Sequence, residues 1–217
     1  MSELAAFVQK NWSTLLRALE VHIRLSFSAV ALGICIAVPL GILLTRFPKA
    51  ARQVLAIVGV FQTIPSMVMF GLAIPLLGIG SKTALVVLVI YSILPILQNT
   101  YTGIAEVPRQ YTEAAKGMGM NTLQALGRVE IPLALPVIVS GIQLSAVYII
   151  SWATVAALVG AGGLGDIIYT GIMTYNYPMI VMGATPACIL AVLTSLVIGR
   201  LVQAVTPRGL KIQRERG

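Results

Sequence analysis

The sequence is poor in charge, histidine and cysteine, and each shortage argues against a class of protein. Only 10% of the 217 residues are charged, whereas a typical soluble domain carries about 25%. Between Ile131 and Gly199 the only charged side chain is that of Asp166. A soluble globular domain is therefore not expected.

Reactive side chains are equally scarce. His22 is the only histidine, so neither a metal site nor a histidine-dependent intramembrane protease is expected. Cys35 and Cys188 fall in apolar runs, where we expect them to fill the protein core rather than form a disulfide or bind a metal. We expect no catalytic residue, no metal and no cofactor in this chain.

Long apolar runs predict helices that cross a membrane. A hydrocarbon core about 30 Å thick needs about 20 apolar residues per helix, and backbone groups in lipid must be paired within the segment. The predicted fold is therefore all-α, a polytopic membrane protein with about five transmembrane helices. The predicted spans are residues 25–44, 54–77, 83–97 with a polar extension to 104, 133–159 and 179–202.

The few charges are segregated, and their distribution predicts the topology. Because positive charge collects on the cytoplasmic side of a membrane, we expect the N-terminus outside and the C-terminus in the cytoplasm. The net charge of +8 then needs no nucleic-acid partner. The outer side carries Lys10, Arg17, Arg24 and Lys82, and the inner side carries Arg46, Lys49, Arg52, Arg109, Lys116, Arg128, Arg200, Arg208, Lys211, Arg214 and Arg216.

Three regions follow from these patterns. Residues 1–24 are amphipathic at helical spacing, with Trp12 on the apolar face, and predict an interfacial helix on the outer surface. Residues 25–204 form the membrane domain, which includes a cytoplasmic loop at 106–131. Residues 205–217 form a basic cytoplasmic tail.

Polar residues interrupt two of the spans. Gln62, Thr63, Pro65 and Ser66 break the second span, either as a packing kink or as a polar part of a substrate path. In the fourth span, Gln143, Ser151 and Thr154 share roughly one helix face. That face either packs against a neighbouring helix or borders the same path.

No acid or base lies in the middle of a span, which argues against proton-coupled transport and voltage sensing. Sodium coupling through carbonyls and hydroxyls stays open. The glycine-rich stretch after the fourth span lacks the Lys-Ser/Thr ending of a phosphate-binding loop. We expect a tight re-entrant turn or a close helix contact at the outer surface, formed by Gly160, Gly162, Gly163 and Gly165.

The cytoplasmic loop predicts two short helices. The first runs over residues 108–116 and is ended by glycines such as Gly119, and the second is capped by Asn121 or Thr122 and ends before Pro132. Such a small acidic projection is either a solvated connector or a docking element.

The spacing in this loop is that of a known signature. Glu113-Ala114-Ala115, three residues, Gly119, nine residues and then Val129-Glu130-Ile131-Pro132 resembles the cytoplasmic motif of permease subunits in binding-protein-dependent ATP-binding-cassette importers. In that motif Ile and Leu stand where this chain has Val129 and Ile131, a conservative departure. The resemblance implies a type I ABC importer permease fold, an inner-membrane location in bacteria and a coupling helix seated in an ATPase subunit.

The resemblance also implies partners and cargo. The expected partners are a second permease subunit (a copy or a paralogue), two ATPase subunits that carry ATP and Mg²⁺, and an external solute-binding protein. Within the family, the chain resembles permeases for glycine betaine, carnitine and choline. The similar stretches are residues 39–46, 62–66, 94–97, 117–120 and 160–166.

Aromatic side chains could hold a quaternary cation along the path, and the candidates are Phe61, Tyr91, Tyr148 and Trp152. A permease for methionine or another amino acid is the alternative within the family, because methionine permeases share the glycine-rich stretch. A stand-alone channel is the alternative outside it.

Overall fold

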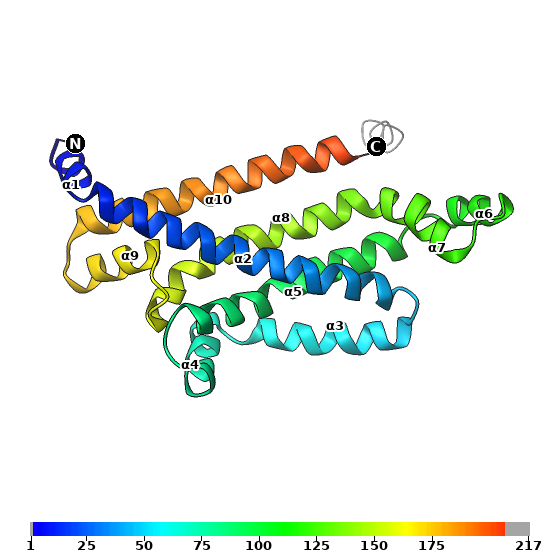
Figure 1. The fold of residues 1–217 in the computed structure, drawn as a ribbon, viewed down its shortest axis with the longest axis horizontal. Coiled ribbons are helices and arrows are strands. Elements are labelled where there is room, and N and C mark those ends of the chain that lie inside the picture. The colour runs from blue at the N-terminus through cyan, green and yellow to red at the C-terminus, as the bar shows by residue number, and fades with distance from the viewer. Residues whose placement is uncertain (1, 207–217) are drawn as a thin grey trace.

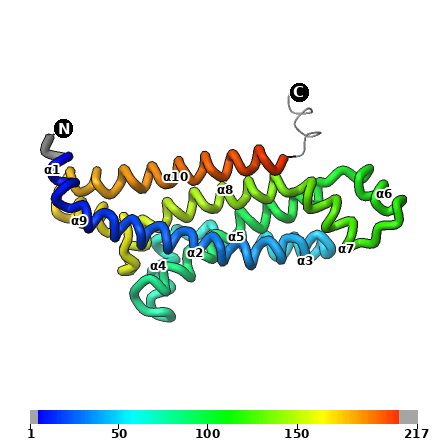
Figure 2. The backbone as a smooth tube through the Cα atoms, turned by 45° about the horizontal axis from the view of Figure 1, so that its top comes forward, coloured from blue at the N-terminus to red at the C-terminus, as the bar shows by residue number. Residues whose placement is uncertain are grey.

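The computed structural model describes residues 2–206, and within them every regular element is helical. Four long apolar helices run side by side along the molecule (Figures 1 and 2). The basic residues expected in the tail beyond Thr206 lie outside the described residues. The four helices are α2 (Trp12–Leu44), α5 (Ser81–Ala105), α8 (Ile131–Val155) and α10 (Tyr177–Val205).

The fifth predicted span is two helices rather than one kinked helix. Helix α3 (Pro48–Thr63) and helix α4 (Ser66–Leu77) meet at an angle of 97°. Ile64 is extended (ψ 125°) because the residue before a proline is forced out of the helical region, and Pro65 is extended as well (ψ 135°). The two halves of the predicted span 54–77 therefore point in different directions (Figure 1).

The N-terminal region also differs from the expectation. The short helix α1 (Ser2–Lys10) is followed by α2, which passes residue 24 without a break. At about 1.5 Å per residue, the 33 residues of α2 extend about 50 Å, which exceeds the hydrocarbon thickness of about 30 Å. The first turns of α2 pack on the protein through buried Leu15, which joins a cluster with Leu164, Ile167 and Met182.

Helix α5 lies at the centre of the bundle between α2 and α8. Its side chains Ala84, Val87, Leu88 and Leu97 are fully buried. Small residues on the neighbours allow this close packing: a Cβ on Gly141 of α8 would lie 2.8 Å from the carbonyl oxygen of Pro95. The third predicted span therefore continues as helix through its polar extension, since the extension packs in the bundle.

Both cysteines are exposed on the surface of this chain, so the expectation that they fill its core is wrong. Cys35 lies on α2 and Cys188 on α10, each on an outward helix face beside exposed apolar residues such as Ile36 and Ile189. A small apolar thiol is suited to a face that meets lipid or another subunit.

Candidate functional site

The predicted docking loop projects beyond the ends of α5 and α8 (Figures 1 and 2). Helix α6 (Arg109–Gly117) begins directly after Pro108, which is extended (ψ 132°) and precedes the helix rather than starting it. The end of α10 lies on this same side of the bundle, and the N-terminus lies on the other (Figure 1).

Gly119 ends α6 in a Schellman motif. The amide of Gly119 donates to the carbonyl of Lys116 (2.9 Å), and the amide of Met120 donates to the carbonyl of Ala115 (3.0 Å). This pattern places Gly119 in the left-handed region at φ +79°, where a side chain is disfavoured. Its surroundings are open, because no atom of the chain lies within 4 Å of a Cβ built there.

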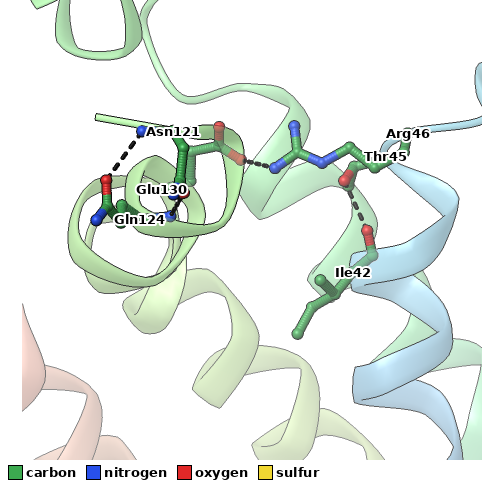
Figure 3. A network of polar contacts seen from close by, with 6 residues as sticks. All are labelled: Ile42, Thr45, Arg46, Asn121, Gln124 and Glu130. Carbon is green, nitrogen blue, oxygen red and sulfur yellow. Dashed lines mark hydrogen bonds and ion pairs between the residues drawn. The ribbon is translucent and has the colours of Figure 1, made fainter. Parts of the chain in front are cut away.

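Asn121 caps the second helix of the loop, which confirms one of the two predicted caps, Asn121 or Thr122. The Asn121 side chain accepts from the amide of Gln124 (2.9 Å), and the Gln124 side chain accepts from the amide of Asn121 (3.0 Å; Figure 3). This reciprocal pair is a capping box. It starts α7 (Thr122–Ala125).

The prediction that this second helix ends before Pro132 is wrong. The π turn η1 (Leu126–Glu130) carries the helix directly into α8, and Pro132 lies in the first turn of α8. A proline normally clashes with the carbonyl four residues before it. A widened turn, in which the amide of Ile131 donates to Leu126 five residues back, relieves this crowding.

One ion pair anchors the base of the projection. The Nη2 atom of Arg46, between α2 and α3, donates to Oε2 of Glu130 in η1 at 2.7 Å (Figure 3). Glu130 is 8% exposed, so its carboxylate is largely removed from water. The sequence analysis placed Glu130 in the motif but missed this partner, because the two residues are far apart in the chain.

The structure divides the motif residues into exposed and buried groups. Glu113, Ala114, Gly119 and Pro132 are exposed, whereas Ala115 is fully buried. Val129 and Ile131 are half-buried. Two large apolar side chains stand beside the exposed group, Met118 at 69% and Leu123 at 78% exposure. The tip therefore presents the Glu113 carboxylate beside two large apolar side chains, which the motif alone did not include.

A polar pocket of about 650 Å³ lies between this projection and the α2–α3 connection. Arg46, Arg109, Lys116 and Glu130 are among its lining residues. In the part of the chain that the structure describes, only Arg46 has an acidic partner, so Arg109 and Lys116 give the pocket a positive character.

Three of the four predicted aromatic candidates converge near the bend between α3 and α4. The rings of Tyr91 and Trp152 are 4.6 Å apart, and those of Tyr148 and Trp152 are 5.5 Å apart. The Tyr91 hydroxyl donates to the carbonyl of Ile64, and the Gln62 side chain donates to the carbonyl of Tyr91. This group of Gln62, Tyr91, Tyr148 and Trp152 is called the aromatic cluster below.

The other predicted path residues lie elsewhere. The Gln143 side chain donates to the carbonyl and hydroxyl oxygens of Ser195 on α10, at 2.9 and 3.0 Å. Thr154 and Ser66 line a separate pocket of about 330 Å³ beside helix α9 (Leu164–Met173). Exposed Thr63 bonds only within its own helix, to Val60.

A different face of α5 and α8 carries exposed polar groups. On α8 the exposed side chains of Ser140, Tyr148 and Ser151 alternate with those of Val137 and Leu144, and Gln98 is exposed on α5. The exposed face of α10 is apolar by contrast, with Val192, Leu193, Leu196 and Val197 each more than half exposed. The first face is called the open face below.

The glycine-rich stretch makes a close contact at the end of the bundle opposite α6. Gly160, Gly162 and Gly163 all have positive φ, between +71° and +90°. A Cβ on Gly165 would lie 2.0 Å from the carbonyl oxygen of Thr154, so α9 abuts the end of α8 backbone to backbone. Partial burial raises the pKa of the neighbouring Asp166 carboxyl above its usual range.

His22 lies at the same end of the bundle and has a structural role. Its side chain is 1% exposed, and Nε2 lies 3.1 Å from the carbonyl oxygen of Ile150, to which it donates as an N–H. Across residues 2–206 no group of histidine, cysteine, aspartate or glutamate side chains is arranged to hold a metal ion.

Comparison with known proteins gives a consistent result. Residues 37–211 match the family described as "Binding-protein-dependent transport system inner membrane component". The chain is 45% identical to the carnitine transport permease protein OpuCB of Listeria monocytogenes, over all of both chains. It is also 45% identical to the glycine betaine/carnitine/choline transport system permease protein OpuCB of Bacillus subtilis, over 99% of both chains.

A solved structure of the methionine ABC transporter MetNI, in an inward-facing conformation, has the same fold. The TM-score is 0.83 at 29% identity, over 91% of this chain and 99% of that one. The family match covers most of the sequence and agrees with the apolar helices and with the motif in the projecting loop. The chain is a multi-pass membrane protein and belongs to the family of binding-protein-dependent transport system inner membrane components.

Proposed function

We propose that this chain forms one half of the translocation path of an ATP-driven importer for a quaternary ammonium osmoprotectant (glycine betaine, carnitine or choline). The observation that carries this proposal is the 45% identity, over nearly full length, to two permeases named for these substrates. An external binding protein delivers the cargo, and this chain is the permease rather than an enzyme.

The open face of α5 and α8 is the part of this chain that borders the path. The Ser140 and Ser151 hydroxyls donate to carbonyls of their own helix, at Pro136 and Val147, so they can face either lipid or water. The exposed Gln98 amide would lose its hydrogen bonds to water if it faced lipid, so this face is better placed against water or a second subunit. A quaternary ammonium group has no N–H to donate, and aromatic faces attract it through its charge. Tyr148, which is 41% exposed, extends the aromatic cluster to this face.

This assignment divides the predicted path residues into those near the path and those that hold helices together. Gln62 and Trp152 border the path. Tyr91 is only 2% exposed and supports them from the core, where its hydroxyl donates to the Ile64 carbonyl beside the bend at Pro65. Gln143 and Thr154 hold α8 against α10 and α9, since Gln143 bonds to Ser195 and the Thr154 carbonyl meets Gly165.

The tip of α6 is the docking site for the ATPase. Glu113, Ala114 and Gly119 touch that subunit, with Met118 and Leu123 adding apolar area. Buried Ala115 and half-buried Val129 and Ile131 hold the tip in place, and Pro132 sets the start of α8. ATP and Mg²⁺ belong to two ATPase subunits, and a second permease completes the path.

The α6 end of the bundle faces the cytoplasm, and the N-terminus faces outward. The start of α3 (Pro48) and the loop from α6 to η1 lie at this end (Figure 1), and these segments carry Lys49, Arg52, Arg109, Lys116 and Arg128. Basic residues near the ends of spans favour that side of a bacterial inner membrane.

Transport by the complete complex in proteoliposomes tests the function. Uptake of labelled glycine betaine should require ATP inside the vesicle and the external binding protein, and unlabelled carnitine or choline should compete with it. Competition by methionine alone would favour the amino-acid alternative. Flux through this chain without ATP would favour the channel.

A further inference from the structure

A pocket of about 280 Å³ lies between α2 and α5, at the end of the bundle opposite α6. Two basic side chains, Arg24 and Lys82, line it together with the hydroxyl-bearing Ser28. Val21, Leu25 and Leu85 form an apolar wall of the same pocket. Its volume is close to the lower limit for small-ligand sites, which suits a single head group rather than a large molecule.

No acidic side chain lines this pocket, although Glu20 lies one helical turn before Arg24 and Asp166 lies near Gly162, next to the pocket residue Ala161. Among residues 2–206 the only acid–base ion pair is Arg46–Glu130, so neither Arg24 nor Lys82 has a carboxylate partner there. Two cations that line one small pocket repel each other, and an anion between them removes that repulsion. The pocket therefore favours an anionic ligand.

The position of the two cations relative to the membrane indicates whether the anion is a lipid or a free ion. Arg24 directly precedes the apolar run that starts at Leu25, and Lys82 directly precedes the run that starts at Thr83. Both charges thus lie at the boundary of the hydrocarbon core, where the phosphates of lipids lie. The apolar wall suits the glycerol and upper acyl region of a lipid, and a free ion in water gains nothing from it.

We propose that this pocket binds the phosphate-bearing head group of an anionic phospholipid. Arg24 and Lys82 contact the phosphate, Ser28 donates a hydrogen bond to it, and the apolar wall packs on the lipid below. The site lies at the far end of the bundle from the α6 tip, and it is independent of which solute the transporter carries.

Native mass spectrometry of the complete transporter tests this site. The complex is extracted from discs made of equal parts phosphatidylethanolamine and phosphatidylglycerol, and the retained lipid is counted. The double variant Arg24→Gln/Lys82→Gln should retain phosphatidylglycerol about fivefold more weakly for each cation removed. The matched control Lys10→Gln/Arg17→Gln removes the same charge from the same side, outside the pocket, and should retain lipid as the parent does.

Two further measurements separate the possible occupants. Inorganic phosphate, added to discs of phosphatidylethanolamine alone, should not protect the complex against thermal unfolding, whereas phosphatidylglycerol should protect it only when Arg24 and Lys82 are present. Protection by inorganic phosphate would overturn the lipid assignment. Equal lipid retention by both double variants would also overturn it, and a selective loss of binding-protein affinity would assign the two cations to protein docking.

Discussion

The Arg46 guanidinium binds the Glu130 carboxylate at 2.7 Å and so joins the connection between α2 and α3 to the π turn that begins α8. The pair lies at the base of the α6–α7 projection, beside the pocket lined by Arg109 and Lys116. Any displacement of the projection therefore acts on three parts of the bundle, through the covalent chain into α5 and α8 and through this ion pair into the end of α2.

Breaking this pair should weaken coupling more than it weakens folding. Arg46→Gln leaves the Glu130 carboxylate without its charged partner, at a cost of about 1.5–3 kcal/mol for a hydrogen bond to a charged group. We expect less substrate transported per ATP hydrolysed, measured in proteoliposomes. Arg52→Gln is the control, because Arg52 is exposed nearby and makes no ion pair within residues 2–206.

The exchanged double variant Arg46→Glu/Glu130→Arg tests the pair itself. It should recover part of the transport lost in Arg46→Gln, because it restores opposite charges at the same two positions. Equal transport by Arg46→Gln and Arg52→Gln would show that the ion pair has no role in coupling.

Substitutions at Gly119 should distinguish its role in the helix-ending turn from its role in docking the ATPase. Gly119→Ala places a Cβ in the left-handed region at a cost of about 1–2 kcal/mol, whereas asparagine tolerates that conformation. Gly119→Asn should therefore match the parent in thermal unfolding yet lower uptake, because its side chain projects where the ATPase docks. Gly117→Ala is the control, being helical and in open space. Normal uptake by a stable, inserted Gly119→Trp would exclude docking at this position.

Gly165→Ala should destabilise the end of the bundle opposite α6. A methyl group there would lie 2.0 Å from the Thr154 carbonyl oxygen, so α9 must move away from α8. Overpacking of this kind costs about 1–3 kcal/mol and should lower the unfolding temperature of the purified protein. Gly71→Ala in α4 is the matched control, since nothing lies within 4 Å of a Cβ at that position. Equal unfolding temperatures would mean that α8 and α9 do not approach this closely.

Loss of the aromatic face at Tyr148 should impair transport of a quaternary cation. Tyr148→Leu keeps an apolar side chain of similar length but removes the ring, and we expect the KM for uptake to rise roughly threefold to tenfold. Tyr148→Phe keeps the ring and should transport as the parent does. The measurement is the uptake rate over a range of concentrations, with Ser140→Ala as a control on the same face. Equal KM values for Tyr148→Leu and Tyr148→Phe would show that the aromatic ring at this position does not contact the transported solute.

The sequence predicted the positions of the helices well and their ends less well. Apolar length alone identifies a span, and every predicted span is helical in the structure except around Ile64 and Pro65. Helix ends depend on capping and packing instead. Thus α2 begins at Trp12, because Leu15 packs on α9 and α10, and α5 continues to Ala105, because its polar end packs on α8.

The sequence predicted only those parts of the candidate site whose residues are close together in the chain. The motif from Glu113 to Pro132 and the cap at Asn121 follow from spacing, since each depends on neighbours in the chain. The Arg46–Glu130 pair and the aromatic cluster bring together residues from separate helices, so no spacing reveals them. The sequence alone could not show whether the Gln143 face or the Ser140 face of α8 is exposed, because that depends on where α10 packs.

The length of α2 has a mechanical consequence. Its 33 residues form one continuous helix from Trp12, at the end of the bundle opposite α6, to Leu44, two residues before Arg46. A helix is stiff along its axis, and in α2 the one backbone hydrogen bond removed by a proline lies near the Leu44 end, at Pro39, where bending is expected. Helix α2 therefore connects the two ends of the bundle without an intervening loop. His22, inside the first half of the helix, bonds to the backbone of α8, and Arg46, just after the helix ends, forms an ion pair with the base of the projecting loop.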